Sequence, residues 1–422
     1  MTTAIVLFNR DLRVHDHPAL SAACEQADHV VPLFVLDPAV PSGARAGFLA
    51  ECLADLRGSL RERGGDLVVR QGDVVRETMK VAAETGAETI CAGADVSSLA
   101  RRREERFEKE RIAFRRFPGV TVVPPDALRP SGGGDHYRVF TPYWRAWTRH
   151  GRRPVLPPPD RISLPSGLAA GRLPDHERRG GPRGGETAAR ERAKLWLRRE
   201  LDGYGDGHDD LAGDRTSRLS PYLRFGCLSP LELAGRAARG ADFVRQLCWR
   251  DFHHQVTYAF PEINRENYRR RERHWRHDRH ALDAWRAGMT GLPIVDAGMR
   301  QLLAEGWMHN RARLIVASYL VRCLGLDWRD GAGHFFHHLL DGDVANNSGN
   351  WQWVAGTGND TRPNRAFNPL RQARRYDPAG EYVRRYVPEL ADVPDGHVHE
   401  PWRLPALPAG YPARLDESLG GA

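Results

Sequence analysis

The segment AIVLFNRDLR at residues 4–13 decides how the first part of the chain can fold, because a short apolar run ends there directly at amide and charged side chains. Such a run is typical of a strand that is buried on both faces of a sheet. Four more runs of the same kind follow, at residues 30–36, 67–69, 89–92 and 120–123. Amphipathic stretches that predict helices lie among them, at residues 47–63, 74–84 and 99–114. Strands that alternate with helices predict an α/β fold with a doubly wound parallel sheet.

The turn after the first strand reads Asn9-Arg10-Asp11-Leu12-Arg13 and contains no GxGxxG pattern, which argues against the usual dinucleotide-binding fingerprint. Ligands of such sheets bind beyond the carboxyl ends of the strands. We therefore expect residues 9–13 and 37–41 to form the walls of a pocket.

The length of 422 residues predicts more than one domain. From residue 129 the composition changes to Gly, Pro and Arg, which predicts a connector whose aromatic middle, VFTPYWRAW, packs against another element. The predicted organisation is an α/β domain at 1–128, a connector at 129–186 and a helical domain at 187–422. The last domain has a capping box at Ser229–Glu232 and no predicted strand. Its longer predicted helices lie at residues 187–201, 242–260, 294–305, 309–324 and 333–340.

The stretch DGDVANNSGNWQWVAGTGN at residues 341–359 combines two carboxylates, three amides from its first ten residues and two indoles. A packed core has little use for so many hydrogen-bonding groups, since each needs a buried partner. A solvated loop has little use for two tryptophans. The mixture favours a pocket for a large, flat organic molecule with polar edges, although a turn leading into a buried helix would also account for it.

The predicted helix at 242–260 has two different faces. The apolar face is expected to be buried and consists of Val244, Leu247, Phe252 and Val256. The other face follows the i, i+3, i+4, i+7 spacing and consists of Gln246, Trp249, Arg250 and His253. An amide, an indole, a guanidinium and an imidazole together suit an aromatic, anionic ligand such as a nucleotide. An ordinary amphipathic helix with one tryptophan in the core would show the same pattern.

Two further segments carry groups that suit an anionic ligand. Asn310 and Arg313 share one face of the predicted helix at 309–324. Residues 216–220, TSRLS, place three hydroxyls and a guanidinium within one turn, which favours phosphate binding. Hydroxyl clusters also cap helices without any ligand.

Charge and cysteine usage bound the class of protein. The net charge of +8 comes almost wholly from arginine, which binds phosphate with a bidentate fork and makes nucleic acid a plausible partner. An Arg-rich codon bias would give the same composition. The six cysteines are scattered without a CxxC pair, which favours reduced thiols and a cytoplasmic protein. No apolar run reaches the length of a membrane span, and the histidine clusters lack an HExxH or cysteine partner, so neither a membrane nor a metal site is expected.

Five longer motifs together resemble the photolyase/cryptochrome family, and they occur in the order in which the family has them. They are NRDLRVHDHPAL, WRDFHHQV, TGLPIVDAGMRQLLAEGWMHNRARLI, DWRDGAGHFF and DGDVANNSGNWQW. The resemblance implies an α/β antenna domain, a linker and a helical domain that binds FAD in a U shape. This agrees with the organisation predicted above.

The resemblance also implies roles for individual residues. Those implied to hold FAD are Tyr204, Thr216, Ser217, Arg218, Leu219, Ser220, Phe243, Arg250, Arg313, Asp341, Asp343 and Asn346. Asp341 is expected to pair with Arg313, Asp343 to lie near the pyrimidine edge of the flavin, and Asn346 to face its N5 and favour the reduced state. Those implied to relay electrons between the flavin and the surface are Trp351, Trp328 and Trp275, which could otherwise be core tryptophans. Those implied to contact DNA or its lesion are Gln246, Trp249, Arg250, Asn310, Arg311, Trp353 and Gln372.

The implied activity is that of a deoxyribodipyrimidine photolyase, acting as a monomer on UV-damaged DNA. Excited FADH⁻ donates an electron to a flipped-out cyclobutane pyrimidine dimer and regains it after the ring opens. Two positions depart from the family pattern, Gln246 in place of a glutamate and Leu314 in place of a methionine. Gln246 occurs in relatives that repair the (6-4) photoproduct, but those carry histidines where this chain has Asn310 and Leu314. We therefore expect repair of the cyclobutane dimer, with a cryptochrome photoreceptor, a (6-4) photolyase and a generic Arg-rich nucleic-acid-binding module as alternatives.

An antenna chromophore is also implied. Folate-using relatives have an Asn-Glu pair where this chain has VSSLAR at residues 96–101. We expect 8-hydroxy-5-deazaflavin, bound by backbone groups and by arginines such as Arg10 and Arg45, in preference to methenyltetrahydrofolate or an empty pocket.

Overall fold

The computed structural model of the protein describes residues 1–40, 43–175, 181–270, 273–359 and 367–415. Part of the predicted connector, residues 176–180, therefore lies outside the described residues. The chain divides into two compact units. The first unit consists of Met1–Asp202 and Ser217–Glu262, and the second consists of Gly203–Thr216 and Ile263–Ala422. Residues 217–262, which the sequence assigned to the helical domain, pack within the unit that contains the sheet.

A parallel sheet of five strands in the order β3-β2-β1-β4-β5 forms the centre of the first unit. The strands are β1 (Thr3–Phe8), β2 (His29–Leu36), β3 (Val68–Gln71), β4 (Thr89–Gly93) and β5 (Ala113–Phe117). All six residues of β1 are buried, and Ile5 lies opposite Val31 on one side and Ile90 on the other. The predicted α/β sheet is confirmed, and its centre is the apolar run with which the sequence begins.

The last strand of the sheet does not lie where the sequence predicts it. Residues 120–123 are buried but form no strand, and the predicted helix at 99–114 ends at Phe107 as α4 (Ser98–Phe107). The edge strand β5 is instead AFRRF, none of whose residues is fully buried, so it lacks the apolar run of an inner strand. The buried apolar run at 120–123 satisfies two of its backbone N–H groups on the carboxylate of Asp251, as described below, and so needs no neighbouring strand.

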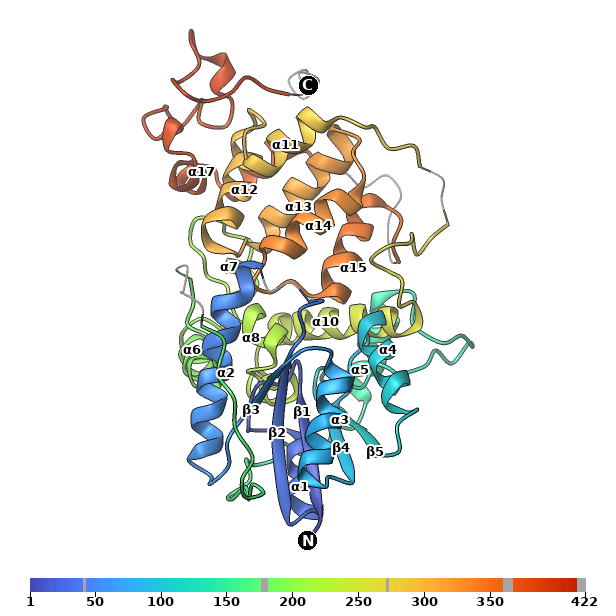
Figure 1. The fold of residues 1–422 in the computed structure, drawn as a ribbon. Coiled ribbons are helices and arrows are strands. Elements are labelled where there is room, and N and C mark those ends of the chain that lie inside the picture. The colour runs from blue at the N-terminus through green and yellow to red at the C-terminus, as the bar shows by residue number, and fades with distance from the viewer. Residues whose placement is uncertain (41–42, 176–180, 271–272, 360–366, 416–422) are drawn as a thin grey trace. The chain divides into compact units, whose positions relative to one another are not determined.

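Helices cover the sheet and extend the first unit (Figure 1). They are α1 (Pro18–Gln26), the short 3₁₀ turn η1 (Gly43–Arg45), α2 (Ala46–Arg61), α3 (Val74–Thr85), α4, α5 (Phe140–Arg149), α6 (Glu186–Arg199), α8 (Ser220–Phe225), α9 (Pro230–Arg236) and α10 (Ala241–Ala259). Helix α5 is the aromatic middle of the predicted connector, and it packs against α10 as expected. The Ser229 half of the predicted capping box is present, since its side chain accepts a hydrogen bond from Glu232 N, whereas the Glu232 carboxylate accepts from Arg190.

The second unit contains helices and no strand within its described residues, as the sequence predicts. Its elements are α7 (Tyr204–Gly207), α11 (Arg279–Ala287), α12 (Pro293–Glu305), α13 (Asn310–Ser318), the π-helical turn η2 (Tyr319–Cys323), α14 (Trp328–His338), α15 (Val344–Ala355), α16 (Pro369–Tyr376), α17 (Glu381–Tyr386), η3 (Pro388–Leu390) and η4 (Pro401–Arg403). Helix α12 matches its predicted range closely, and the range predicted at 309–324 is covered by α13 and η2. Helix α14 begins five residues before the predicted range 333–340, and α11 and α15 were not among the predicted ranges.

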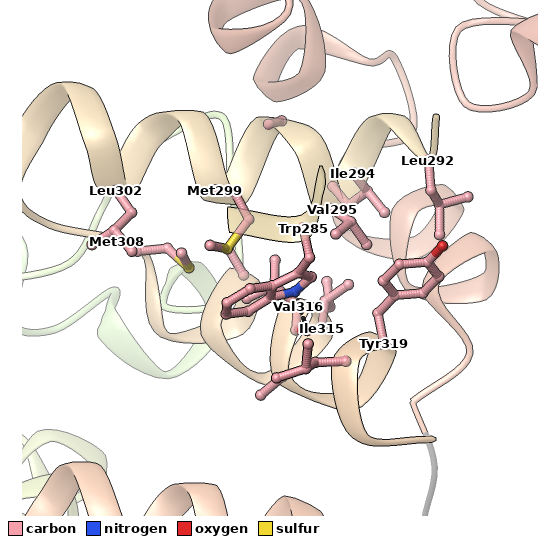
Figure 2. Close-up of a cluster of buried hydrophobic side chains, with 14 of the residues drawn as sticks. Trp285, Leu292, Ile294, Val295, Met299, Leu302, Met308, Ile315, Val316 and Tyr319 are labelled. Carbon is pink, nitrogen blue, oxygen red and sulfur yellow. Dashed lines mark hydrogen bonds between the residues drawn. The ribbon is translucent and has the colours of Figure 1, made fainter. Parts of the chain in front are cut away.

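The core of the second unit surrounds the fully buried Trp285 of α11. Figure 2 shows its ring among Met299 and Val295 of α12 and Ile315 and Val316 of α13, and its indole N–H donates to the Val316 carbonyl at 3.0 Å. Trp328 and Trp351 belong to the same cluster of buried side chains. Two of the three predicted relay tryptophans are therefore built into a rigid core.

Within the described ranges, none of the helices combines the length and the apolar character that crossing a membrane requires. All six cysteines are free thiols.

Candidate functional site

The polar stretch at residues 341–347 leads into helix α15, so both interpretations of its composition hold in part. Asp343 caps the helix: its Oδ1 accepts hydrogen bonds from the backbone N and from the side-chain Nδ2 of Asn346, each at 2.8 Å. The amide nitrogen of the half-buried Asn346 is thereby used within the chain. Its amide oxygen is the group that remains suited to accept a hydrogen bond from a ligand.

The expected pair of Asp341 and Arg313 is present in the second unit. Arg313 Nη2 donates to Asp341 Oδ2 at 2.8 Å, and Arg313 Nε donates to the Met308 carbonyl at 2.8 Å, which fixes the guanidinium. Asp341 is 9% exposed, and its Oδ1 is buried without a hydrogen-bond partner among the described residues. Thr216 Oγ1, in the same unit, is also buried without a hydrogen-bond partner among the described residues. Buried polar atoms of this kind need a partner, which a bound water or a ligand supplies, and the N–H and hydroxyl groups of a flavin nucleotide suit these two.

The predicted phosphate-binding residues of the first unit show a strained backbone. Arg218 has a φ of 51°, which only a few per cent of non-glycine residues adopt and which costs of order 1 kcal/mol. Ser217 Oγ accepts from Leu219 N at 3.3 Å, and the Ser217 carbonyl accepts from Arg192 Nε at 2.7 Å, so both neighbours of Arg218 are held. Ser220 then begins α8. Strain of this kind is common at ligand clamps, and the phosphate-binding role of this segment stays a prediction.

Helix α10 has the two faces that its sequence predicts, with one exception. The four apolar residues are buried, Gln246 is exposed, and Trp249 and Arg250 are half-buried, but His253 is buried as well. Arg250 donates to the Val120 carbonyl and, at 3.5 Å, to the Leu223 carbonyl. Phe243 is buried against Trp196, with ring centroids 4.6 Å apart.

The indole of Trp249 is stacked on Phe140 of α5, with ring centroids 3.6 Å apart and an interplanar angle of 3°. Phe140 is almost fully buried, and it supports one face of the half-buried indole. The sequence identified Trp249 but not Phe140, because nothing in the aromatic middle of the connector shows which ring faces α10. A tryptophan that is supported from behind is well placed to stack on a nucleobase.

Asp251, the neighbour of Arg250, joins three segments of the first unit. Its Oδ2 accepts hydrogen bonds from Val122 N at 2.9 Å, Val123 N at 3.0 Å and Trp147 Nε1 at 2.9 Å. Asp251 is 1% exposed, and its burial raises the pKa of the carboxyl to about 6. The charge of Arg250 and the three hydrogen-bond donors lower the pKa, but burial has the larger effect. Asp251 fixes the position of α10, and the sequence analysis missed it.

Of the three predicted relay tryptophans, two are buried and the third, Trp275, is partly exposed. Trp351 and Trp328 are 2% and 0% exposed, and Trp275 is half-buried. Gly331, one turn after Trp328 on α14, leaves room for Trp351: a Cβ at this glycine would lie 2.1 Å from the indole Cη2. Trp328 Nε1 donates to Asn267 Oδ1 at 3.0 Å, and Arg276 N, next to Trp275, donates to the Gly325 carbonyl at 2.8 Å. The segment that carries Trp275 therefore lies along the start of α14.

The remaining residues predicted to contact DNA have mixed surroundings in the second unit. Arg311 forms a bidentate pair with Asp209 at 3.1 and 2.5 Å and lies over the Tyr376 ring, so its guanidinium is already bound within the unit. Asn310 is exposed, and Trp353 lies 6.0 Å from the Phe367 ring. Gln372 Oε1 is buried and has no partner among the described residues. Across the parts of the chain that the structure describes, no group of three or more His, Cys, Asp or Glu side chains could hold a metal ion.

Comparison with known proteins agrees with this geometry. A family model described as the FAD binding domain of DNA photolyase matches residues 243–415, and one described as DNA photolyase matches residues 4–161. A deoxyribodipyrimidine photo-lyase of Streptomyces griseus is 50% identical over 96% of this chain and 94% of its own length. The chain belongs to the photolyase/cryptochrome family.

Solved structures of the family share the whole architecture. A bacterial class III photolyase from Agrobacterium tumefaciens has a TM-score of 0.93 at 34% identity, over 99% of this chain and 95% of its own. A cryptochrome from Synechocystis has a TM-score of 0.91 at 29% identity, over 99% of this chain and 96% of its own. The matched FAD-binding region begins at Phe243 in α10, so the predicted phosphate-binding residues at 204 and 216–220 precede it.

Of the two arginines that were expected to bind an antenna chromophore in this photolyase-family chain, Arg10 makes contacts within the fold. Arg10, after β1, pairs with Asp95, after β4, at 3.0 Å, and it also donates to the Arg224 carbonyl. The order of the strands reverses between β1 and β4, which is where such sheets bind ligands. Arg13 is 1% exposed and donates to four backbone carbonyls, so it anchors the turn and does not form a pocket wall. Arg45 is buried.

Proposed function

We propose that the protein is a light-driven DNA repair enzyme, a deoxyribodipyrimidine photolyase that splits cyclobutane pyrimidine dimers. The observation that carries the proposal is the set of buried polar groups at the start of α15, with Asp341 oriented by Arg313 and Asp343 bound to Asn346, in a region that matches the FAD binding domain of DNA photolyase. The relative from Streptomyces griseus, which is 50% identical and is named a deoxyribodipyrimidine photo-lyase, supports this type of reaction.

The chain's own residues would position the cofactor and the lesion. Bound reduced FAD would supply the light-excited electron that opens the cyclobutane ring and then returns. Asp341 and Asp343 would accept hydrogen bonds from ring N–H groups, and the amide oxygen of Asn346 would face the flavin. Trp249, supported by Phe140, would stack on the flipped-out dimer. No residue has to act as a general acid or base in this reaction.

The relay tryptophans would serve activation and not repair itself. Trp351, Trp328 and Trp275 would carry electrons inward when the flavin is oxidised. The enzyme would act as a monomer in the cytoplasm, a location that the six free thiols support.

The test is repair of an oligonucleotide with a single thymine cyclobutane dimer by chemically reduced protein under blue light. We expect intact thymines to appear under light and not in the dark, and far less repair of an oligonucleotide with a (6-4) photoproduct. Trp249→Ala should reduce dimer binding, and Trp351→Phe is the matched control that should repair normally after chemical reduction. Flavin that binds while no dimer is repaired would contradict the proposal.

A photoreceptor is the second candidate, because the cryptochrome DASH of Danio rerio is 36% identical over 95% of this chain and 86% of its own. The same oligonucleotide separates the two functions, since a receptor that does not repair would leave the dimer intact in both single and double strands.

A further inference from the structure

The segment that carries Trp275 holds a large share of the positive charge of the chain. We call residues 264–270 and 273–280 the basic segment. It contains six arginines and two acidic residues, a net charge of +4 with neutral histidines, in a chain whose total is +8. Arg265, Arg270, Arg276 and Arg279 are exposed. Arg276 pairs with Asp278 at 2.5 Å and Arg279 with Asp283 at 3.7 Å, yet their side chains remain 62% and 95% exposed. The residues around the start of α14 reduce this excess by only one charge, because Arg329 pairs with Asp327 and offsets one of the two carboxylates at 327 and 330.

Helix α15 holds the first half of the basic segment in place through the buried side chain of Gln352. Its Nε2 donates to the Ile263 carbonyl at 2.6 Å and the Glu266 carbonyl at 2.8 Å, and its Oε1 accepts from Tyr268 N at 2.8 Å. Gln352 directly follows Trp351, the first tryptophan of the predicted relay. It therefore ties the segment that carries Trp275, the last tryptophan of the relay, to helix α15. The charges therefore have a defined position relative to Trp275.

The second half of the basic segment is held by two further contacts. Arg273 donates to the Ala355 carbonyl at the end of α15, and its guanidinium lies 4.6 Å from the centroid of the Trp275 ring. Arg276 N donates to the Gly325 carbonyl. A cation on the face of an indole disfavours loss of an electron from that ring. An oxidised Trp275 would therefore be a strong oxidant, and it would be surrounded by positive charge.

We propose that the basic segment is the docking site of a small anionic one-electron donor, of the carboxylate or enediolate class, that reduces oxidised Trp275. The proposal rests on the relay role of Trp275 in the proposed function. One electron passes from the donor to the indole, and the donor leaves oxidised by one electron. Where the indole has lost its N–H proton, water returns it.

The size of the effect follows from Coulomb attraction in water. Three to four unit charges about 10 Å from a monoanion raise its local concentration by roughly five- to ten-fold at low salt. Because the Debye length falls to about 3 Å at 1 M, most of this gain disappears at high ionic strength. A neutral donor of similar strength gains nothing.

The experiment follows the decay of the tryptophan radical after a laser flash on the flavin-loaded, oxidised enzyme. Ascorbate is the anionic donor, dithiothreitol the neutral one, each at low and high ionic strength. We expect the second-order rate constant of ascorbate to fall about five-fold with salt, and that of dithiothreitol to change little. The double variant Arg276→Glu and Arg279→Glu should lose the ascorbate advantage at low salt and keep the dithiothreitol rate.

The matched control is Arg161→Glu with Arg172→Glu, two exposed arginines of the first unit that give the same change in total charge. A second readout, fluorescence quenching, needs no photochemistry. The fluorescence of Trp275 is measured as the difference between the parent and Trp275→Phe. The anion iodide should quench it more strongly than neutral acrylamide does, and this difference should be lost in the double variant of Arg276 and Arg279.

The outcomes separate this inference from the proposed function. If the radical forms but both donors respond alike to salt and to the arginine changes, the docking site is refuted and the repair proposal stands. If the control variant slows ascorbate as much as the test variant, the effect is one of total charge and the site is likewise refuted. If no Trp275 radical forms after the flash, whichever donor is present, Trp275 is not part of the relay, and this inference is refuted as well.

Discussion

Replacing Asp251 should show that an acceptor oxygen, and not a negative charge, holds the first unit together around α10. The carboxylate Oδ2 accepts from two backbone N–H groups and the Trp147 indole, all within 3.0 Å. In Asp251→Ala these three donors stay buried without a partner, at about 1–3 kcal/mol each. We expect a loss of roughly 3–5 kcal/mol in the free energy of unfolding, a large part of the stability of a typical domain.

Asp251→Asn is the matched variant, since it keeps one oxygen at the acceptor position. Burial raises the pKa of Asp251 from its ordinary value of 3.8 to about 6, so the fold binds the proton more tightly than the unfolded chain does. The stabilising contribution of this group is therefore fully present below pH 3.8 and is lost as the pH rises through 6. By linkage the loss amounts to about 3 kcal/mol at neutral pH. The neutral asparagine avoids this cost, and we expect its stability at pH 7.5 to lie within about 1 kcal/mol of the parent.

The measurement is urea unfolding of the parent and both variants at pH 5 and pH 7.5, followed by fluorescence and circular dichroism. The stability of Asp251→Asn relative to the parent should rise by about 1–2 kcal/mol between the two pH values, because only the parent titrates at this site. The reasoning is refuted if Asp251→Asn loses as much stability as Asp251→Ala at pH 7.5. That result would mean that the charge pairing with Arg250, and not the acceptor oxygen, holds these segments.

The remaining predictions concern cofactor, relay and DNA. Trp351→Phe should abolish photoreduction of oxidised flavin, because phenylalanine is far harder to oxidise, and undiminished tryptophan radical in transient absorption would exclude the relay. Asp343→Asn with Ser217→Ala keeps the acceptor that caps α15 and should lower the flavin content of the purified protein, so full occupancy would show that the pocket is misplaced. Phe140→Ala should weaken binding of a dimer-containing oligonucleotide about ten-fold by removing the ring behind Trp249, and unchanged affinity would show that the stack is not needed. Affinity for that oligonucleotide should fall steeply between 50 and 200 mM salt as phosphate contacts release counterions, and a salt-independent affinity would argue against DNA as the ligand.

The inner strands of the sheet could be predicted because burial on both faces leaves a continuous apolar run. The edge strand β5 could not, since AFRRF has two central arginines and its first two residues lie within the helix predicted at 99–114. The run at 120–123 has the composition of a strand, but a carboxylate 128 residues away in sequence binds one of its amides. Which partner satisfies a buried backbone group is a long-range fact, and local composition does not contain it.

The same division separates the residues of the site that could be predicted from those that could not. The stretch at 341–347 has polar groups that are too dense for a core, so its composition alone indicates a site. The pairing of Asp341 with Arg313 was implied by the resemblance to the family and not by composition. Phe140 and Gln352 could not be predicted, because each is one of many aromatic or amide residues in the chain. They matter because one supports Trp249 from behind and the other binds the segment that carries Trp275. Residues that bind a ligand form unusual combinations of polar and aromatic side chains, which can be recognised in a short stretch of sequence. Residues that position them only have to fit their neighbours in the fold, so the three-dimensional structure is required to find them.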